Sequence, residues 1–541
     1  MDNPSSTPLH TLPSVRWAEG LVSPIPESSM SNLEEDAADE AAVAAEILPL
    51  HPSTPRNGAR ASIGAFISGQ NKATPVKSTT HAAKDEDAKA FYALIRDELG
   101  EPIESDDHWA HKLYQGLVPK LKITKYLKDS GEYDWEAKRW VRIPETVESE
   151  KELYDPICKI TNSILNRLAP SGTAEMREAI DTHIAKFKHE ALSPTTRYSS
   201  PDIVIKAKGP SFSVPSDAPV GYSNTASVFD GKRDSKATQV QDHIGQLGGY
   251  SRQVFIQQPN RFFVRCLVIT EKRARLFHFD RSGIQYTPLF NIHKLPHILV
   301  RLILGLCCID ERVLGFDDSV QWTIGANGSK VAGTLRTIGP KNTIVEYELA
   351  MDAKPFTRNS IRGRGTTCWP IKDANNRRLL VKDYWMSDGR VPEFTLLEEL
   401  DNVQGVCKML CYEGERAKTK DNRGKVNIFG ADIFHNRTAI RIVLELYGPT
   451  IEKFTNPRQL LGALRDAIAG HRVLVTNGIF HRDICPENIL LGFNDEGWRG
   501  VLIDLGMAIK TKRPISDICE DFKSRMIISM TWKDSFGSMS F

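Results

Sequence analysis

The fold of this chain is decided by the stretch HRDICPEN at residues 481–488, which is followed by DLG at residues 504–506. Asp483 supplies a carboxylate that can accept a proton, and Asn488 and Asp504 supply the side-chain oxygen atoms that Mg²⁺ prefers. Chemistry on phosphate groups needs both, because a base positions the attacking hydroxyl while a metal binds the phosphate oxygens. These residue types could therefore supply a base at Asp483 and metal ligands at Asn488 and Asp504.

Two upstream segments carry further residues for the same chemistry. The stretch IRGRGTT at residues 361–367 contains Gly363 and Gly365, whose missing side chains let backbone N–H groups approach phosphates. The apolar run LLV at residues 379–381 predicts a strand that continues into Lys382. We therefore expect a phosphate-binding loop, followed by a strand that carries a lysine.

Three later segments complete the pattern. Glu393 opens a run in which leucines recur at helical spacing, and this helix places Glu393 to pair with Lys382. The run IVLELYG at residues 442–448 predicts a strand and a hinge that carry Glu445 and Tyr447. A further helix is predicted from the apolar stripe Leu460, Leu461, Leu464, Ala467 and Ile468.

These segments, in this order, resemble the working parts of a protein kinase. The resemblance implies that ATP lies under the loop of Gly363 and Gly365, with Lys382 at its α- and β-phosphates. It also implies that the strand and hinge of Glu445 and Tyr447 hold the adenine. Mg²⁺ is the metal that the resemblance implies.

Five stretches narrow the resemblance to one family. They resemble the fungal-type protein kinase family over roughly residues 195–510. The resemblance implies an ATP- and Mg²⁺-dependent phosphotransferase that acts on a protein substrate, with serine and threonine phosphorylation as the default by analogy. The stretches are GRGT (363–366), VKDYW (381–385), FDRSG (279–283), LGFD (314–317) and NGIFHRDICPENILL (477–491).

The chain departs from the kinase pattern in three places. Cys485 stands where Ser/Thr kinases commonly carry a lysine that contacts the γ-phosphate. Cys368 replaces the third glycine of the loop, and Pro370 replaces the valine that follows it. Only 35 residues follow Gly506, without a segment resembling APE, so we expect a truncated C-lobe. A second hypothesis is therefore a catalytically impaired nucleotide-binding pseudokinase or scaffold.

The patterns predict an α+β chain of four parts. Residues 1–85 predict a disordered tail, and residues 86–200 a mainly helical region. Residues 201–325 predict a mixed α/β domain, and residues 326–541 a two-lobed protein-kinase-like domain whose C-lobe is incomplete. Within these parts we expect a helix over residues 176–187 and strands over residues 202–205, 262–269 and 274–279.

The middle domain holds a second set of residues with chemistry of its own. Asp202 follows a proline, and Asp230 and Lys232 stand two residues apart. Gln246 and Tyr250 stand four residues apart on a predicted helix. The order resembles the PD-(D/E)xK nuclease core, in which two carboxylates hold a divalent metal and a lysine activates the attacking water. The alternative is structural: a strand end, a surface charge and ordinary helix packing.

Basic and aromatic residues alternate near residue 270, in a pattern that could bind nucleic acid. A pair of strands with one face exposed to solvent produces the same alternation of basic and aromatic residues, and we favour that interpretation. Nucleic acid is therefore not the expected partner, and the middle domain is the one place where it could bind. The residues are Arg261, Phe262, Phe263, Arg265, Lys272, Arg273, Arg275 and Phe277.

Composition limits the classes of partner and the cellular locations that we expect for this chain. Lys and Arg number 70 and Asp and Glu 68, so no overall charge attracts nucleic acid or membranes. The apolar run at residues 295–309 is interrupted by Arg301 and is too short to span a bilayer, so we expect a core helix and no membrane partner. Nine cysteines without a CxxC pair, and no secretory signal, predict an intracellular protein, cytoplasmic or nuclear.

Overall fold

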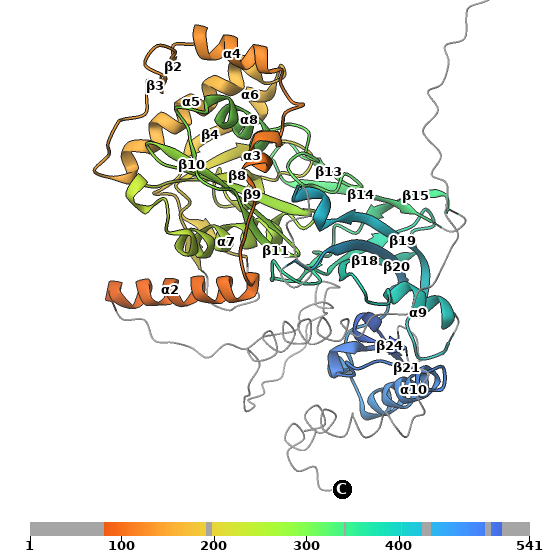
Figure 1. Ribbon diagram of the computed structural model, residues 1–541. Coiled ribbons are helices and arrows are strands. Elements are labelled where there is room, and N and C mark those ends of the chain that lie inside the picture. The colour runs from red at the N-terminus through yellow and green to blue at the C-terminus, as the bar shows by residue number, and fades with distance from the viewer. Residues whose placement is uncertain are drawn as a thin grey trace, which may run out of the picture. The chain divides into compact units, whose positions relative to one another are not determined.

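The computed structural model describes residues 80–190, 197–339, 342–401, 403–424, 434–492 and 499–510, with side chains from residue 88. These residues form both helices and sheets (Figure 1), so the predicted α+β class is confirmed. The predicted disordered tail lies outside the described residues up to residue 79, and its last residues belong to a helix that begins at Thr80. The predicted C-lobe beyond residue 510 also lies outside the described residues.

The first sheet belongs to the middle block, our name for the described residues from 88 to 319. Its strands lie in the order β1-β11-β10-β9-β8-β7-β4, and β12 pairs with β10. β8 and β9 run parallel and are joined by helix α7 (Val240–Gln257), because a parallel pair needs a crossover. The strands are β1 (Ile103–Glu104), β4 (Arg177–Asp181), β7 (Ile203–Ala207), β8 (Thr225–Gly231), β9 (Phe263–Ile269), β10 (Arg273–Asp280), β11 (Gly283–Tyr286) and β12 (Phe290–Asn291).

Helices cover both faces of this sheet (Figure 1). Successive strand residues point to opposite faces, so Ile203 and Ile205 pack into one core while Val204 packs into the other. Helices α5 and α8 close the first core, and α2 and α7 close the second. The helices besides α7 are α2 (Thr80–Leu99), α3 (Asp107–Lys112), α4 (Lys120–Asp129), α5 (Tyr154–Leu168), α6 (Thr173–Met176) and α8 (Pro296–Leu306).

The predicted helix over residues 176–187 is wrong, because most of that stretch is extended. Helix α6 ends at Met176, and β4 then pairs antiparallel with β7. Arg177 and Ala179 are buried and Glu178 is exposed, which is the two-residue period of a strand. The region predicted as mainly helical thus contributes strands to the sheet of the middle block. Two small hairpins pair β2 (Tyr133–Asp134) with β3 (Arg139–Trp140) and β5 (Phe187–Lys188) with β6 (Tyr198–Ser199).

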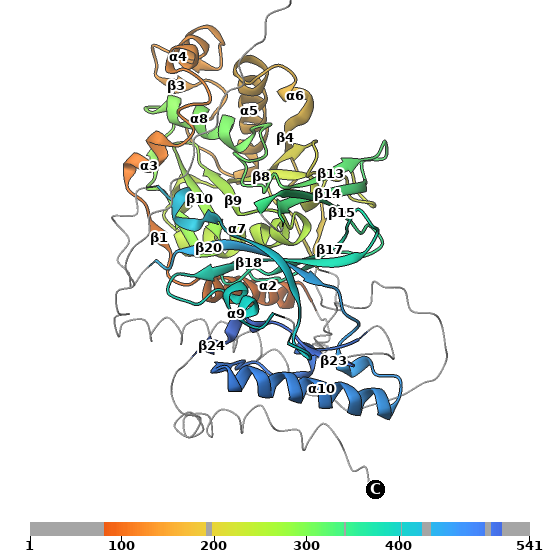
Figure 2. The ribbon, with the colours of Figure 1, turned by 90° about the vertical axis from the view of Figure 1, so that its right-hand side faces the viewer.

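A second, antiparallel sheet begins at Val320, so the predicted boundary after residue 325 falls between two of its paired strands. Its order is β13-β14-β15-β17-β18-β20-β19, with β16 on β17. One face packs helix α9 (Glu393–Glu399), through Leu396 and Leu397, against Ile442 (Figure 2). The strands are β13 (Val320–Ile324), β14 (Lys330–Ile338), β15 (Ile344–Leu349), β16 (Phe356–Thr357), β17 (Thr367–Lys372), β18 (Arg378–Ser387), β19 (Met409–Lys418) and β20 (Arg437–Glu445).

Helix α10 (Pro457–Thr476) follows and packs against the short strands that flank the HRD and DLG stretches. Its buried face includes Ala463, Ala467 and Leu474. Leu461 and Ile468, which belong to the predicted apolar stripe, are instead exposed. The buried face is therefore formed by smaller residues than the sequence predicts. The strands are β21 (Ile479–Phe480), β22 (Ile489–Leu491), β23 (Gly500–Leu502) and β24 (Ile509–Lys510).

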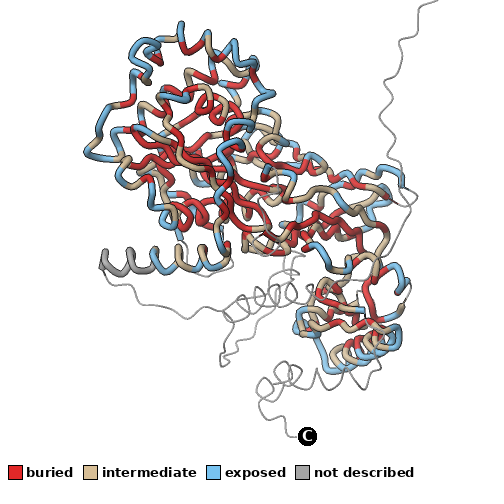
Figure 3. Tube along the Cα trace, viewed as in Figure 1, coloured by how far each residue is buried: buried red, intermediate tan, exposed pale blue. Residues whose placement is uncertain are grey.

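Most of the basic residues near residue 270 are buried, and the part of the tube that forms the sheet of the middle block is drawn mostly in red (Figure 3). Arg261 donates to the carbonyls of Leu314 at 2.6 Å and Ala226 at 2.9 Å. Arg265 donates to the carbonyl of Asn422 at 2.9 Å. The predicted solvated face is therefore wrong, because helices cover both faces of β9 and β10 and the arginines bind internal carbonyls. In the part of the chain that the structure describes, no helix is both long enough and apolar enough to cross a membrane.

Candidate active site

Lys382, Glu393 and Asp504 form a buried, ion-paired cluster. Lys382 lies on β18 opposite Ile442 of β20, and Glu393 is the first residue of α9. The Nζ atom of Lys382 lies 2.6 Å from Oε2 of Glu393 and 2.7 Å from Oδ1 of Asp504. Three residues that are distant in the sequence are thus brought into direct contact.

The charges in this cluster stabilise one another. Burial alone would lower the pKa of Lys382, but Asp504 and Glu393 raise it above its ordinary value. Burial alone would raise the pKa of Asp504, but Lys382 and Arg364 lower it well below its ordinary value. Lys382 and Asp504 are therefore both charged at neutral pH. The second carboxylate oxygen of Glu393 accepts a hydrogen bond from the backbone N–H of Leu505 at 3.1 Å.

The HRD stretch is held against the residues that precede DLG. β22 pairs antiparallel with β23, and the backbone N–H of Ile503 donates to the carbonyl of Asn488 at 3.0 Å. His481, which is fully buried, lies with Nε2 2.9 Å from the carbonyl oxygen of Ile503. These bonds place Asn488 and Asp504, the predicted metal ligands, on adjoining segments.

Asp483, the predicted base, is in contact with Asn488. The side-chain amide of Asn488 donates to the carbonyl of Asp483 at 2.9 Å and to its carboxylate at 3.1 Å. Arg482 and Asp504 have φ angles of 65° and 62°, in the left-handed region that residues other than glycine seldom adopt. Backbone strain of this kind collects at functional sites, where the surrounding contacts hold it in place.

The oxygen donors here fit Mg²⁺ bound jointly by protein and phosphate. Asn488 offers an amide oxygen and Asp504 a carboxylate, and both are hard donors. Among the described residues, no group of three or more His, Cys, Asp or Glu side chains is arranged to hold a metal ion. A metal with so few protein ligands needs phosphate oxygens and water to complete its shell, as Mg²⁺ does at nucleotide sites.

Gly363 and Gly365 lie in the loop between β16 and β17, with φ angles of 114° and 48°. The N–H of Gly363 donates to the carbonyl of Arg281 at 3.0 Å. A Cβ atom on Gly365 would lie 2.3 Å from Nε of Arg281, so only glycine fits there. Cys368, at the position of the third glycine, lies on β17 opposite Lys382. The loop thus carries the predicted glycines close to Lys382 and packs on the middle block.

Arg364 stands between the two glycines and reaches the charged cluster. Its Nη1 atom lies 3.3 Å from Oδ1 of Asp504. The sequence pattern assigns Arg364 no role, although this residue stands in the GRGT stretch that supports the family resemblance. Its contact crosses 140 residues of sequence, so no local pattern could have revealed it.

Glu445 and Tyr447 lie together where β20 ends. The hydroxyl of Tyr447 donates to Oε2 of Glu445 at 3.4 Å and accepts from the N–H of Lys408 at 3.0 Å. Glu445 also pairs with Arg377 at 2.9 Å. They follow Ile442, which lies opposite Lys382. Their role in holding adenine stays a prediction.

The five residues of the second predicted site also meet. β7 and β8 pair antiparallel, which brings Asp202 beside Asp230 and Lys232. The Nζ atom of Lys232 lies 2.8 Å from Asp230 Oδ2 and 3.5 Å from Asp202 Oδ2. Gln246 of α7 donates to Asp230 at 3.3 Å and to the hydroxyl of Tyr250 at 3.0 Å. Lys232 is therefore a buried partner of two carboxylates rather than a surface charge.

Two residues that the sequence analysis missed join this group. Glu150 lies 3.8 Å from Nζ of Lys232, and the Tyr154 hydroxyl hydrogen-bonds Asp202. Burial and the neighbouring Asp230 raise the pKa of Asp202 to about 7, although Lys232 opposes the shift. Asp202 therefore exchanges a proton near neutral pH, as a carboxyl beside a second carboxylate does.

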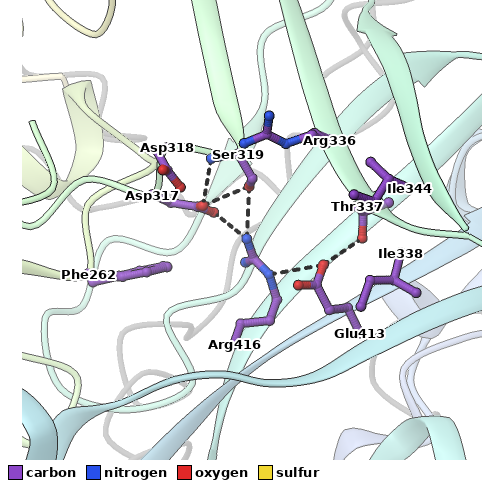
Figure 4. Close-up of a pocket in the computed structure, with 10 residues that line it drawn as sticks. All are labelled: Phe262, Asp317, Asp318, Ser319, Arg336, Thr337, Ile338, Ile344, Glu413 and Arg416. Atoms are coloured by element: carbon purple, nitrogen blue, oxygen red, sulfur yellow. Dashed lines mark hydrogen bonds and ion pairs between the residues drawn. The ribbon is translucent and has the colours of Figure 1, made fainter. Parts of the chain in front are cut away.

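A pocket of about 290 Å³ shares no lining residue with either group (Figure 4). Within it Arg416 lies 2.8 Å from Asp317 and 3.5 Å from Glu413. The lining carries three carboxylates, those of Asp317, Asp318 and Glu413, and two guanidinium groups, those of Arg336 and Arg416. Its lining residues are Phe262, Asp317, Asp318, Ser319, Arg336, Thr337, Ile338, Ile344, Glu413 and Arg416.

Comparison with protein families supports the sequence resemblance. The family described as fungal protein kinase matches residues 200–423 and 412–524, which together make up more than half of the chain. The match covers the strands β7 to β11 of the middle block as well as the HRD and DLG stretches. No curated protein matches the chain. The extent of the family match shows that the chain belongs to the fungal protein kinase family.

Proposed function

We propose that the chain is an ATP-dependent protein kinase that phosphorylates serine or threonine side chains. The observation that carries the proposal is the buried contact of Lys382 with both Glu393 and Asp504. Phosphoryl transfer depends on positioning and on fixed charges, and a lysine held by a carboxylate supplies a fixed cation for phosphate oxygens. Membership of the family supports a kinase-like function in general.

In this proposal the residues around Lys382 have separate roles in phosphoryl transfer. Asp483 accepts the proton of the substrate hydroxyl, and its contact with Asn488 supports that role by fixing the carboxylate. Asn488 and Asp504 hold Mg²⁺, which supplies charge neutralisation at the phosphates when it is bound. The loop of Gly363 and Gly365 covers the phosphates.

The same proposal assigns the fold to two lobes. The second sheet with α9 forms the upper lobe, and α10 with β21 to β24 begins the lower one. Adenine lies beside Glu445 and Tyr447, where β20 ends. An intracellular location, cytoplasmic or nuclear, is part of the proposal and is supported by eight free cysteines among the described residues.

The test is Mg²⁺-dependent ATP binding and turnover on the full chain, with Asp483→Ala and Lys382→Ala beside it. The proposal expects both variants to lose turnover, and only Lys382→Ala to lose ATP affinity as well. Binding that depends on Lys382 without any turnover would instead support the pseudokinase or scaffold. A wild-type chain that binds no ATP would contradict both.

A second candidate function is cleavage of phosphodiesters by the middle block. The specific observation in its favour is that Asp202, Asp230 and Lys232 meet, beside Gln246 and Tyr250, as the resemblance to a nuclease core requires. In this proposal the two aspartates hold a divalent metal, and Lys232 releases them to orient the attacking water. The structural alternative is a buried ion cluster that only stabilises the sheet.

The two interpretations differ in how the chain responds to metal. A catalytic site predicts Mn²⁺- or Mg²⁺-dependent cleavage of single- or double-stranded DNA that Asp230→Asn abolishes while ATP binding is unchanged. A structural cluster predicts that Asp230→Asn lowers the melting temperature and that the wild-type chain cleaves nothing.

A further inference from the structure

Arg364 brings an additional cation to the site of Lys382. Its guanidinium lies 3.3 Å from Asp504, and its side chain is only 13% exposed. The backbone N–H of Trp385, on the same strand as Lys382, donates to the carbonyl of Arg364 at 2.7 Å. The residue is thus fixed at the backbone, with its charge directed at the DLG stretch.

Two cations meet at the Oδ1 atom of Asp504. Lys382 lies 2.7 Å from this atom and Arg364 lies 3.3 Å from it, while Glu393 is the other carboxylate in contact with Lys382. Arg358, whose charge also acts on Asp504, has a buried Nε atom that makes no hydrogen bond within the described residues. Two adjacent cations suit an anion with several charges, such as a polyphosphate.

The catalytic loop does not supply this charge at residue 485. A cysteine side chain is neutral or negative and never positive, so Cys485 cannot supply a cation. A cation for the terminal phosphates must then come from another segment. Arg364, in the loop that faces Asp504, is placed to provide it.

We propose that Arg364 binds the terminal phosphate groups of ATP and that Arg281 of the middle block positions it. The inference rests on the proposed ATP-dependent function of the same site. The guanidinium contacts the same Oδ1 atom of Asp504 as Lys382 does, and a guanidinium can bind two oxygen atoms of one phosphate at once. Arg364 is therefore a binding residue, whereas Arg281 acts only through the loop.

Arg281 anchors the loop on the side that precedes Arg364. Its guanidinium donates to the carbonyls of Ser360 at 2.8 Å and Ile361 at 3.2 Å, and its own carbonyl accepts from Gly363. Arg281 is buried and its side chain lies against Gly365. Because Arg281 bonds to the residues before Arg364 and packs against the residue after it, the loop cannot shift without breaking these contacts.

The neighbouring residue anchors Arg281 in turn. Asp280 forms a two-pronged pair with Arg423, at 2.7 and 2.6 Å, and both side chains are buried. The N–H of Ser282 also donates to Asp280 at 2.7 Å. The FDRSG stretch, whose role the sequence did not reveal, thus links the middle block to the phosphate-binding loop.

Equilibrium binding to the full chain tests Arg364. We expect Arg364→Ala to raise the Kd for MgATP by about 10- to 100-fold, as for the loss of a charged hydrogen-bond donor, and to leave the Kd for adenosine unchanged. Arg364→Lys should recover part of the loss. Arg378→Ala is the matched control, because Arg378 lies on β18 and makes only a partly exposed ion pair with Asp352.

A double-mutant comparison tests Arg281. If Arg281 acts by positioning Arg364, Arg281→Ala weakens MgATP binding in the wild-type chain and adds little in the Arg364→Ala chain. An equal loss of MgATP affinity in both chains would show that Arg281 has a purely structural role. It would overturn the proposal that Arg281 positions Arg364.

The outcomes separate this inference from the proposed function. MgATP binding that needs Lys382 but is unchanged by Arg364→Ala overturns the inference and leaves the function standing. A wild-type chain without Lys382-dependent ATP binding overturns both.

Discussion

Glu393 shows how a single residue can serve two segments at once. One carboxylate oxygen accepts from Lys382 at 2.6 Å, and the other accepts from the N–H of Leu505 at 3.1 Å. The side chain is 1% exposed, so no water replaces either partner. The position of DLG against α9 therefore depends on the same carboxylate that orients Lys382.

Replacing Glu393 with Gln should lower both stability and ATP-dependent turnover. Removing one partner of a buried ion pair costs about 3 kcal/mol, and here Lys382 keeps only Asp504. Thermal unfolding and steady-state kinetics measure the two effects. The control is Glu399→Gln on the same helix, because Glu399 pairs with Lys510 at the surface and should cost less than about 1 kcal/mol. Equal losses in the two variants would contradict the prediction.

Single residues also mark the limit of what the sequence could predict. Lys382, Glu393 and Asp504 follow from their order and from apolar spacing, and the structure brings them together. Arg281 and Arg364 could not be found in this way. Their contacts depend on how a turn of one sheet meets a loop of another, and neither segment carries periodic information about that meeting.

At the level of elements, helix α10 packs closely because glycines face each other across the contact. A Cβ atom on Gly470 would lie 2.5 Å from the backbone oxygen of Gly405, and one on Gly405 would lie 2.4 Å from that of Asp466. Small residues here let the helix approach the chain segment before β19. The exposed Leu461 and Ile468 reflect the same geometry, because the helix turns its small face inward.

Two alanine substitutions on this helix should have opposite effects. Gly470→Ala forces a methyl group against rigid backbone, so we expect a loss of about 1–3 kcal/mol. Gly462→Ala meets mainly the flexible side chain of Arg499 and gains helix propensity, so its effect should lie between zero and about 1 kcal/mol of stabilisation. Thermal unfolding of both variants decides the point. A Gly470→Ala variant as stable as the wild type would show that the backbone at Gly405 shifts to accommodate the added methyl group.

The elements that the sequence misassigned are those decided by tertiary contacts. Residues 177–181 carry a mixed pattern that also fits a helix, and pairing with β7 makes them a strand. In the sequence, the arginines of β9 and β10 form the same pattern as basic residues on a strand face that is exposed to solvent. Arg265 of β9, and Arg261 just before this strand, are buried and donate to internal carbonyls, and such partners leave no trace in local composition.

For the molecule as a whole, buried charges join the middle block to the second sheet. Asp317 lies 2.8 Å from Arg416 and 3.1 Å from Arg441, and Arg441 also pairs with Asp383 at 2.6 Å. Asp280 and Arg423 form the other buried pair. Breaking one partner of such a pair exposes the other to an apolar environment, so the two sheets should unfold together.

Stability of the whole chain should fall as the pH is lowered through 6.5 toward 4. Burial lowers the pKa of His189, His243 and His278 to about 4, with nearby arginines or lysines adding to the shift. At these three histidines the unfolded chain, with pKa values near 6.5, binds more protons in this window, and together they outweigh the opposite contribution of Asp202, whose pKa is raised. Each histidine should cost about 2 kcal/mol at pH 5.

Calorimetry of the wild-type chain and of His243→Leu measures the effect. His243 is 2% exposed and its Nδ1 atom has no hydrogen-bond partner within the described residues, so leucine removes the titration without removing a bond. The melting temperature of His243→Leu should fall less between pH 7.5 and 5 than that of the wild type. An identical decrease in melting temperature in the two proteins would show that protonation of His243 does not contribute to the loss of stability.

The sequence positions of the buried ion pairs that join the two sheets decide when each pair can form during synthesis of the chain. Asp280 precedes Arg423 by 143 residues, and Asp317 precedes Arg416 by 99, so a ribosome completes each acid long before its base. Domains generally fold from the N-terminus as they emerge. Until the later sheet is made, the nascent middle block therefore carries Asp280 and Asp317 without the arginines that pair with them in the folded chain.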